Sequence, residues 1–303
     1  GAPYGRLQGA EQEGEKTMGK IVIVGSGPAG CSAALYAARA GQEVVVISMG
    51  MGALSKAELI QNYYGFEEGI TGAELYRQGV AGAKAVGAEF ITAEVVGLDY
   101  TGSLVVQTTE GDYPADAVIL ATGAGRIAPK IAGLAEHEGR GVSYCATCDA
   151  FFYRGKMAAV LGSGEYALHE VQALLPLAGK VILCTNGEPL TADFPEGVEI
   201  CTEKLAAVEG EEKVSALRLE NGELLPVEGL FAALGVAGSA ALARKLGAPV
   251  ENGRIVVDEK MQTGIPGLYA AGDCTGGLLQ VCKAVYEGAL AATEAIKQIR
   301  GKK

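Results

Sequence analysis

The stretch Lys20-Ile21-Val22-Ile23-Val24-Gly25-Ser26-Gly27-Pro28-Ala29-Gly30 decides the fold of this chain. Its first five residues predict a short buried strand, a G-x-G-x-x-G turn follows, and a helix is predicted over Cys31–Ala40. Between a strand and a helix, such a turn lets backbone N–H groups approach a pyrophosphate at the helix N-terminus. We therefore expect a βαβ unit, closed by a strand over Glu43–Ser48. We expect it to bind a dinucleotide through Gly25, Gly27, Pro28, Ala29 and Gly30.

The end of the second strand lacks the residue that usually accompanies this turn. An acid there would bind a ribose hydroxyl, but the chain has Ser48-Met49-Gly50-Met51. The adenosine end of the dinucleotide must therefore be held differently. Cys31, on the first turn of the helix, is interpreted as a packing residue.

The composition is typical of a two-domain α/β protein. With 303 residues, 49% of them hydrophobic, the chain can bury two cores, and its 45 glycines are about twice the average share. The net charge of −11 disfavours nucleic acid as a partner, and no apolar run is long enough to span a membrane. The seven cysteines are odd in number, and six of them are scattered or lie within predicted elements. With a start that lacks a signal-peptide pattern, they favour a cytoplasmic location. Residues 1–18 are expected to be a disordered leader or tag.

A cysteine pair, Cys145-Ala146-Thr147-Cys148-Asp149, lies near the middle of the chain. Three interpretations compete: a redox pair, half of a zinc site, or two buried cysteines. Zinc would need a second Cys or His pair, yet Cys274 and Cys282 are eight residues apart and the two histidines are isolated. We therefore favour a redox pair and expect no metal site. Asp149 would lie within hydrogen-bonding range of the proton that must move when a disulfide opens.

The segment after the first βαβ unit predicts a loop, a helix and an antiparallel insert. Residues 51–66 have no clear period, and the adjacent Tyr63 and Tyr64 either line a flat ring ligand or belong to a surface turn. An amphipathic helix is predicted over Thr71–Val86, and strands over Glu89–Leu98, Ser103–Thr109 and Tyr113–Leu120. The last strand ends in Ala121-Thr122-Gly123, an arrangement typical of FAD-binding domains.

A second, smaller βαβ unit follows the cysteine pair. It consists of a strand over Lys156–Leu161, the glycine turn Gly162-Ser163-Gly164, a helix through Leu175 and a strand over Lys180–Cys184. Further strands are predicted over Val198–Thr202, Lys204–Glu209, Val214–Leu219, Leu224–Pro226 and Gly229–Gly235.

The last part of the chain returns to the pattern of the first. Strands are predicted over Arg254–Val257 and Thr263–Asp273, and a long helix over Leu279–Ile299. The Gly272-Asp273 ending predicts an aspartate that meets the ribityl hydroxyls of a flavin, although any acid could end a strand there. We therefore predict an α/β fold with two Rossmann-like, three-layer nucleotide-binding domains. The FAD domain (19–127 and 237–303) is split by a smaller inserted domain (128–236).

Together these motifs resemble the low-molecular-weight thioredoxin reductase family over nearly all of residues 19–303. The resemblance depends most on the cysteine pair and the residues before it, Gly139-Arg140-Gly141-Val142-Ser143-Tyr144. The first glycine turn, the Ala-Thr-Gly strand end and the motif that ends in Gly272-Asp273 also match the family. The resemblance implies FAD as cofactor, thioredoxin as partner and a homodimer. It also implies that one domain rotates against the other, so that the disulfide lies on the flavin in one arrangement and is offered to thioredoxin in the other.

The resemblance also implies the roles of individual residues. Cys145 and Cys148 would form the active disulfide, with Cys148 facing the flavin and Cys145 attacking thioredoxin, while Asp149 would donate the proton. Outside the glycine turn, the implied FAD contacts are Asn62, Ala121, Thr122, Gly123, Gly272, Asp273, Gln280, Val281 and Cys282.

The chain departs from this family where NADPH would bind. It lacks the His-Arg-Arg sequence that clamps the 2′-phosphate, and residues 181–203 contain five acids but no Lys or Arg. A phosphate dianion would lose partners worth about 1.5–3 kcal/mol each, so NADPH is disfavoured, while Glu188 leaves NADH open as a donor. These losses resemble a pyridine-nucleotide-independent branch of the family whose flavin is reduced by ferredoxin. Ferredoxin is therefore our leading hypothesis for the donor, and its docking would need a local basic patch.

The flavin side departs from the family as well. Where the family has Gly-Gly-Gln-Leu, this chain has Met51-Gly52-Ala53-Leu54. Where the family has Arg-Gln-Ala, it has Gln280-Val281-Cys282. Cys274 and Cys282 flank this site and are interpreted as packing residues and not as a second redox pair. Three alternative functions stay open: an NAD(P)H-linked thioredoxin reductase with atypical nucleotide contacts, a flavin-dependent dithiol oxidase, and a non-catalytic flavoprotein that senses redox state.

Overall fold

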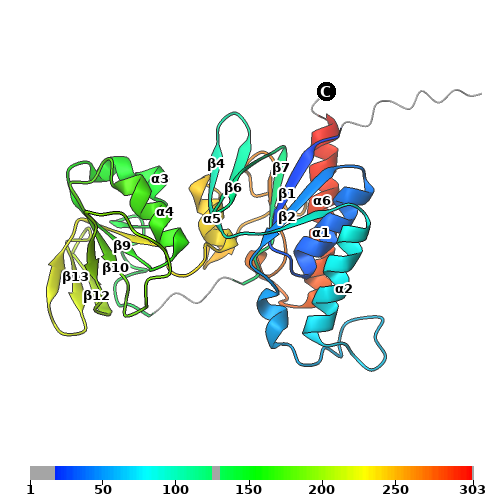
Figure 1. The fold of residues 1–303 in the computed structure, drawn as a ribbon, viewed down its shortest axis with the longest axis horizontal. Coiled ribbons are helices and arrows are strands. Elements are labelled where there is room, and N and C mark those ends of the chain that lie inside the picture. Colours follow the sequence, from blue (N-terminus) through cyan, green and yellow to red (C-terminus); the bar gives the residue numbers. More distant parts are fainter. Residues whose placement is uncertain (1–17, 125–129, 302–303) are drawn as a thin grey trace, which may run out of the picture.

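The structure is a computed structural model that describes residues 18–124 and 130–301. The chain forms two parallel sheets, one in each half of the molecule (Figure 1). The first sheet has the strand order β18-β7-β1-β2-β3. Its strands are β1 (Lys20–Val24), β2 (Glu43–Ser48), β3 (Glu89–Thr92), β7 (Ala117–Leu120) and β18 (Leu268–Ala270). Because β18 pairs with β7, this sheet joins an early and a late segment of the chain.

Helices cover the first sheet and bury its apolar strands. α1 (Pro28–Arg39) and α6 (Val281–Gly301) pack against each other and share a core with β1 and β7. α1 begins three residues earlier than predicted, because a proline suits the first helical position, where its missing N–H leaves no hydrogen bond unmade. α2 (Gly72–Ala85) is capped by Thr71, whose side chain accepts the N–H of Glu74 (3.2 Å).

Two of the predicted strands are each divided in the structure. The segment 89–98 forms β3 and the start of β4 (Val95–Tyr100), and the segment 113–120 forms the end of β6 (Gly111–Ala115) and β7. The second division falls at Asp116, whose carboxylate accepts the N–H of Lys20 (2.8 Å). With β5 (Leu104–Thr108), strands β4 and β6 form an antiparallel sheet of their own.

The second parallel sheet has the order β11-β10-β9-β15-β8. Its strands are β8 (Val142–Ser143), β9 (Met157–Leu161), β10 (Lys180–Cys184), β11 (Glu199–Cys201) and β15 (Gly229–Ala232), and it carries helices α3 (Ala146–Asp149) and α4 (Glu165–Leu174). Strands β12 (Leu205–Glu209), β13 (Ala216–Leu219) and β14 (Leu224–Pro226) form an antiparallel sheet that shares its core. The α/β class with two Rossmann-like units is thus confirmed.

Helix α5 (Ser239–Lys245) lies between the two halves of the molecule (Figure 1). The local sequence pattern does not predict this helix. It packs on β4 and on the hairpin of β16 (Val250–Glu251) and β17 (Arg254–Ile255). The strand predicted over 263–273 is limited to β18, because Gly264 and Gly267 adopt positive φ angles (83° and 82°) and turn the chain before it. Short 3-10 turns cover Gly52–Lys56, Ala150–Tyr153 and Asp273–Thr275.

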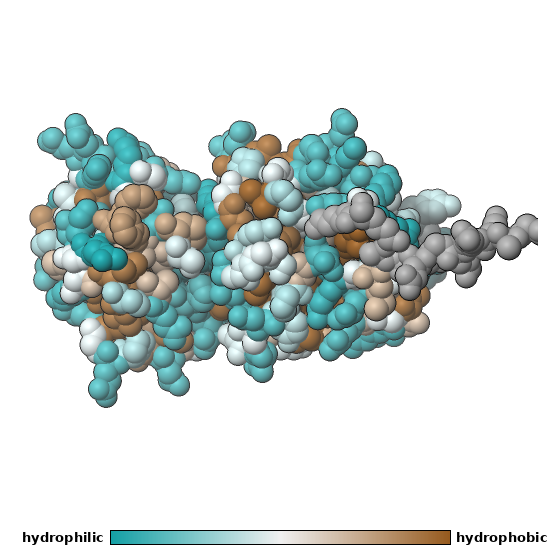
Figure 2. Space-filling view, turned by 90° about the horizontal axis from the view of Figure 1, so that it is seen from above, coloured by the Kyte–Doolittle hydropathy of each residue, from teal (hydrophilic) through white to brown (hydrophobic). Residues whose placement is uncertain are grey.

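Some predictions fall outside the described residues. The predicted leader, apart from the exposed Met18, and the domain boundary at 127/128 are among them. In the parts of the chain that the structure describes, no helix is both long and apolar enough to cross a bilayer. The face seen from above carries many hydrophilic side chains, with smaller hydrophobic areas between them (Figure 2).

Candidate flavin and disulfide site

The first glycine turn forms an open cradle at the start of α1. A Cβ at Gly25 would collide with the carbonyl group of Ala121, and one at Gly30 would collide with the carbonyl oxygen of Gly25. Gly27 differs, because a Cβ there would meet no atom within 4 Å. Gly27 is also the N-cap of α1, and no side chain caps the helix there. No side chain therefore competes for the N–H groups of the first turn of α1, as a pyrophosphate site requires.

Two serines meet where an acid was expected at the end of β2. The hydroxyl oxygens of Ser26 and Ser48 are 2.6 Å apart, and the hydroxyl of Tyr76 lies 3.0 Å from Ser26. These hydroxyl groups offer donors and acceptors without a charge. They are the polar groups that could hold the adenosine end of a dinucleotide in place of the missing acid.

The structure brings together several predicted FAD contacts that are far apart in sequence. The Asn62 side chain donates to the Gln280 side chain (3.0 Å) across 218 residues. Val281 packs against the apolar cluster of Leu54, Ile60 and Ile70, which positions this loop at the start of α6. Tyr64 is 96% exposed, which supports the surface-turn interpretation for that tyrosine.

The Gly272-Asp273 box lies against the first glycine turn. A Cβ on Gly272 would lie 3.0 Å from the Cβ of Ala29, so these two predicted contacts are neighbours. Glu287 of α6 accepts the N–H of Gly272 (2.8 Å), and Lys283 donates to the carbonyl of Gly272 (2.9 Å). Lys283 and Glu287 also pair with each other (3.0 Å). This i,i+4 pair fixes the backbone that presents Asp273.

Thr122, in the Ala-Thr-Gly strand end, is bonded to the first residue of α5. Ser239 N–H donates to Thr122 Oγ1 (2.8 Å), while Thr122 N–H donates to Ser239 Oγ (3.1 Å). The N-terminus of α5 is therefore fixed to the cradle. Taken together, the open Gly27, the free first turn of α1 and the fixed Gly272-Asp273 backbone fit a bound FAD.

Cys145 and Cys148 form a disulfide at the start of α3. Their Cα atoms are 5.4 Å apart, and Cys145 is the N-cap of the helix, its sulfur accepting the N–H of Cys148 (3.2 Å). Cys145 is only 4% exposed, whereas Cys148 is exposed. The sulfur of Cys148 lies 3.3 Å from the carbonyl oxygen of Lys245, at the far end of α5. A cysteine pair joined in this way is not available as half of a zinc site.

Ser143 connects Asp149 to the disulfide. Its hydroxyl donates to Asp149 Oδ2 (2.7 Å) and accepts the N–H of Cys145 (3.1 Å). The carboxylate that the sequence assigns to proton transfer is thus oriented by a hydroxyl two residues before the first cysteine. Ser143 is not among the predicted site residues, although its position in Ser-x-Cys is typical of a local side-chain cap.

A buried ion pair lies behind the redox helix. Lys245 of α5 pairs with Glu170 of α4, and each side chain is 1% exposed. The other carboxylate oxygen of Glu170 accepts the N–H of Ala146, the first residue of α3. Burial raises the pKa of Glu170, but the His169 hydrogen bond and the Lys245 charge outweigh it, so the pKa is lowered overall. Glu170 therefore stays ionised and connects the helix that carries the disulfide to α5.

Further contacts join the residues on either side of β8 to α5, and α4 to β4. Arg244 pairs with Glu138 (3.1 Å), and its guanidinium lies 4.4 Å from the ring centre of Tyr144. The His169 ring lies against Gly97 of β4, where a Cβ would be 3.1 Å from it. Residues 169, 170, 244 and 245 were missed by the sequence analysis because nothing in their local pattern indicates a contact across such sequence distances.

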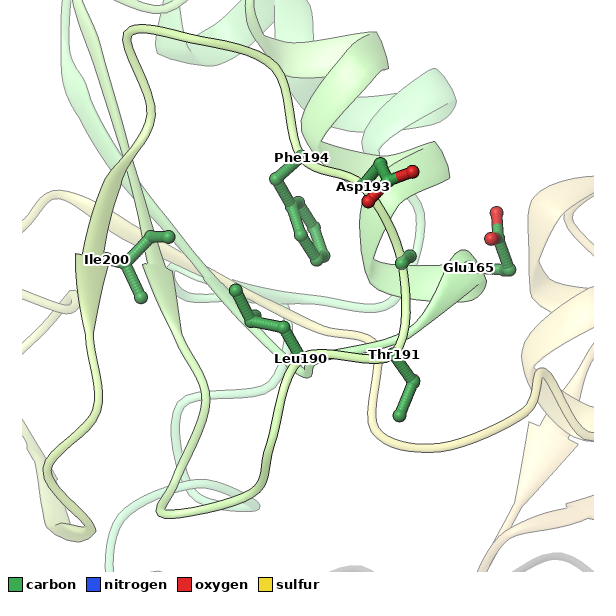
Figure 3. A pocket seen from close by; sticks show the side chains of 7 residues that line it. Glu165, Leu190, Thr191, Asp193, Phe194 and Ile200 are labelled. Atoms are coloured by element: carbon green, nitrogen blue, oxygen red, sulfur yellow. The ribbon is translucent and has the colours of Figure 1, made fainter.

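The second glycine turn is covered by the chain itself. A Cβ at Gly164, the counterpart of Gly27, would lie 3.0 Å from Thr191 Oγ1, and Thr191 N–H donates to the carbonyl of Ser163 (2.9 Å). Beside this contact is a cavity of about 580 Å³, lined by Glu165, Leu190, Thr191, Ala192, Asp193, Phe194 and Ile200 (Figure 3). The only charged side chains that line it are two carboxylates, so it suits a phosphate poorly.

The remaining predictions about cysteines have mixed outcomes. Cys31 is buried, its pKa is raised by burial to about 12, and its sulfur lies 3.1 Å from the carbonyl of Ser26, so the packing interpretation is confirmed. It is also confirmed for Cys274, whose pKa is raised by burial to about 11. It is wrong for Cys282, which is exposed because it points away from the core on the first turn of α6. Its role as an FAD contact stays a prediction.

Comparison with known proteins agrees with this geometry. The chain matches the pyridine nucleotide-disulphide oxidoreductase family over residues 19–288. It is 36% identical to a thioredoxin reductase of Aquifex aeolicus, over 93% of this chain and 94% of that protein. The crystal structure of the atypical thioredoxin reductase TRi from Desulfovibrio vulgaris Hildenborough is 40% identical with a TM-score of 0.88, over 93% of this chain and 98% of that one. A ferredoxin-flavin thioredoxin reductase from Clostridium acetobutylicum is 35% identical with a TM-score of 0.72, over 94% and 99%.

An FAD cradle and a redox disulfide on two Rossmann-like units define a flavin-linked disulfide oxidoreductase. The family match shows which family of such enzymes the chain belongs to, and relatives above 30% identity over nearly the whole chain point to the thioredoxin reductase type. The chain belongs to the pyridine nucleotide-disulphide oxidoreductase family, as an FAD-binding enzyme of the thioredoxin reductase type.

Proposed function

We propose that this enzyme reduces thioredoxin through the Cys145–Cys148 disulfide, and that its flavin receives electrons from reduced ferredoxin and not from NADPH. The observation that carries the choice of donor is the contrast between the two glycine turns. Gly27 faces open space, whereas Gly164 is covered by Thr191. A pyridine nucleotide would have to displace the loop around Thr191 before its pyrophosphate could reach the helix.

The charges beside the second turn support the same proposal. Glu165 and Asp193 line the cavity there, and residues 181–203 contain no Lys or Arg. A 2′-phosphate at this place would meet repulsion without the bidentate donors that usually bind it. NADH would avoid the phosphate penalty but would still meet the covered turn.

The resemblance and the contacts of α5 support a short path between cofactor and disulfide. FAD, when bound, supplies the two electrons that reduce the disulfide. α5 is fixed to the cradle at Ser239 and reaches the disulfide at Lys245, and its seven residues span about 10 Å. After reduction, the Cys148 thiol would have the Lys245 carbonyl within reach as an acceptor, and Asp149 would supply the proton that the dithiol needs.

An apolar and basic surface beside the disulfide supports a protein acceptor. Phe151 and Phe152 lie in the 3-10 turn Ala150–Tyr153 that follows α3, and each is 67% exposed. Arg154 stacks on Phe151 (5.4 Å to the ring centre), and Lys156 is exposed nearby. Exposed aromatic and arginine side chains of this kind are typical anchors of protein interfaces. We propose that thioredoxin docks here, and that the active form is a homodimer in the cytoplasm.

One anaerobic experiment tests the donor. The loss of the visible flavin band is followed after mixing the oxidised holoenzyme with NADPH, NADH or reduced ferredoxin. We expect rapid bleaching with reduced ferredoxin only. Prompt bleaching by NADPH would remove the ferredoxin proposal, and prompt bleaching by NADH alone would favour the NAD(P)H-linked alternative.

Two variants test the assigned cysteine roles. In Cys148→Ser, the remaining Cys145 thiol should trap thioredoxin as a stable mixed disulfide, whereas Cys145→Ser should not. Neither variant should turn over thioredoxin. Turnover by Cys148→Ser would contradict the roles, and rapid oxygen consumption without thioredoxin turnover in the wild type would favour the dithiol oxidase.

A further inference from the structure

A second pair of cysteines lies at the opposite edge of the inserted sheet. Cys184 ends β10, Cys201 ends β11, and the two residues are direct partners in the parallel register. Neighbouring strands are about 4.8 Å apart, which lies within the 4.4–6.8 Å Cα separation that a disulfide spans. Partners in register also place their side chains on the same face of a sheet. In the structure both residues are free thiols.

The two thiols differ in burial and in chemistry. Cys184 is fully buried, whereas Cys201 is partly exposed. The thiol of Cys184 and the backbone N–H of Glu203 are the donor groups that act on the Cys201 sulfur. These donors lower the pKa of Cys201 to about 6, although its burial and the carboxylates of Glu203 and Glu223 act in the opposite direction. At neutral pH, Cys201 is therefore mainly a thiolate with a protonated partner.

The other free cysteines give a comparison within the same molecule. Burial raises the pKa of Cys31 to about 12 and that of Cys274 to about 11, so both are protonated at neutral pH. Cysteines that react with oxidants are accessible thiolates next to a second thiol that can resolve the product. Among the free cysteines that the structure describes, Cys201 has this combination.

We propose that Cys201 and Cys184 form a second dithiol site, at which a hydroperoxide oxidises Cys201 and Cys184 resolves the product to a Cys184–Cys201 disulfide. In the first step the Cys201 sulfur attacks the peroxide, the O–O bond breaks, and an S–O bond forms. Sulfur loses two electrons, and the leaving alkoxide or hydroxide takes a proton from solvent. In the second step the Cys184 sulfur attacks the sulfenic acid, so that the S–S bond forms and water leaves with the Cys184 proton.

This site is separate from the catalytic disulfide. The redox helix follows β8, at one edge of the sheet, whereas Cys201 lies on β11 at the other edge. Four strand spacings separate the two edges, which is about 19 Å. Direct exchange between the two pairs is therefore excluded in this arrangement, and the second pair reports on peroxide independently of thioredoxin turnover.

Peptide mapping of the holoenzyme tests the proposal. Because no Lys or Arg lies between Lys180 and Lys204, trypsin places both cysteines in one peptide, residues 181–204. The reduced enzyme is exposed to one equivalent of hydrogen peroxide, and the remaining thiols are then alkylated. We expect this peptide to lose both labels and two hydrogens, while the peptides with Cys31 and Cys274 keep their labels. Equal labelling of all these cysteines after peroxide would overturn the proposal.

Variants separate the two roles. Cys184→Ala should leave a sulfenic acid on Cys201 that dimedone traps, and Cys201→Ser should leave Cys184 fully labelled. Cys31→Ser is the matched control and should oxidise as the wild type does. Alkylation of Cys201 should be half-maximal near pH 6 and should move to higher pH in Cys184→Ala. A midpoint near that of an ordinary thiol in the wild type would contradict the proposed pairing.

Discussion

Glu170 is the residue on which most of the contacts behind the disulfide depend. One of its oxygens pairs with Lys245, the other caps α3 at Ala146, and His169 adds a hydrogen bond. A buried ion pair contributes little compared with a well-packed apolar pair, but removal of one partner leaves the other charged and unpaired. The main effect of the pair is therefore to hold α3 in position relative to α5, and its net contribution to stability is small.

The first prediction concerns this pair. Glu170→Gln should lower the free energy of unfolding by about 3–5 kcal/mol, because it leaves the Lys245 ammonium buried without a counter-charge. The double variant Glu170→Gln, Lys245→Met should recover most of that loss. Denaturant unfolding of the holoenzyme measures both, and a single variant as stable as the wild type would show that the pair is solvated.

The second prediction gives the pH dependence of the same pair. The pKa of Glu170 is lower in the folded protein than its usual value of about 4.3. A depressed carboxyl pKa contributes stability above the unfolded value, and this stability is lost as the pH falls through the folded value. The difference in unfolding free energy between wild type and Glu170→Gln should thus be constant near neutral pH and shrink only below about pH 4. A difference that already shrinks near pH 6 would contradict this assignment.

The third prediction concerns Ser143. Ser143→Ala removes the hydrogen bond to Asp149 and the cap on Cys145, so proton transfer to the dithiol should be less well oriented. We expect kcat/KM for thioredoxin to fall about tenfold, which corresponds to about 1.4 kcal/mol. Ser143→Thr, which keeps the hydroxyl, should recover most of the activity. FAD content should not change in either variant.

At the scale of elements, the two glycine turns have similar sequences and different surroundings. The sequence predicts both turns, the two βαβ units and the positions of most strands along the chain, because these features depend on local pattern. It does not predict α5 or the covering of Gly164 by Thr191, because both depend on contacts between segments that are distant in the chain. Asn62 and Gln280 are both predicted as FAD contacts, but their hydrogen bond to each other is not predicted, because they are also distant in the chain.

The fourth prediction is a matched pair of substitutions in these turns. Gly27→Ala places a methyl group in the open space where a pyrophosphate would lie, so FAD content should fall at least tenfold while the fold remains. Gly164→Ala only presses on Thr191 Oγ1, so FAD content and thioredoxin turnover should stay near the wild-type values. Loss of turnover in Gly164→Ala with full FAD content would indicate that a nucleotide does use the second turn.

At the scale of the whole molecule, the structural similarity to relatives varies although the covered share of the chain stays the same. The TM-score is 0.88 to the Desulfovibrio vulgaris structure but 0.54 to a Lactococcus lactis thioredoxin reductase in the FR conformation, although each comparison covers 93% of this chain. Similar elements with a lower overall score are expected when two domains are packed in a different orientation. Any rotation of this chain must separate Glu170 from Lys245 and Glu138 from Arg244.

The fifth prediction tests this rotation. Arg244→Ala removes a partly exposed ion pair and the stacking on Tyr144, together worth about 1–2 kcal/mol, which should raise the rotated population about tenfold. Arg218→Ala removes a similarly exposed pair with Glu209 inside the inserted domain and is the control. Pulsed electron paramagnetic resonance between one spin label on each half measures the populations. Equal distance distributions in all three proteins would contradict the prediction.

The different burial of the two catalytic sulfurs has a consequence for selectivity. Cys145, the proposed nucleophile toward thioredoxin, is 4% exposed in this arrangement, beneath the contacts that α5 makes with the inserted domain. Small disulfides and oxidants in the surroundings therefore reach the Cys145 sulfur poorly in this arrangement, whereas the Cys148 sulfur is accessible to them. The rotation that the family resemblance implies would expose this buried Cys145 sulfur only after α5 has separated from the inserted domain. Selectivity for a protein acceptor would then depend on access to this one sulfur and not on the chemistry of the disulfide that approaches it.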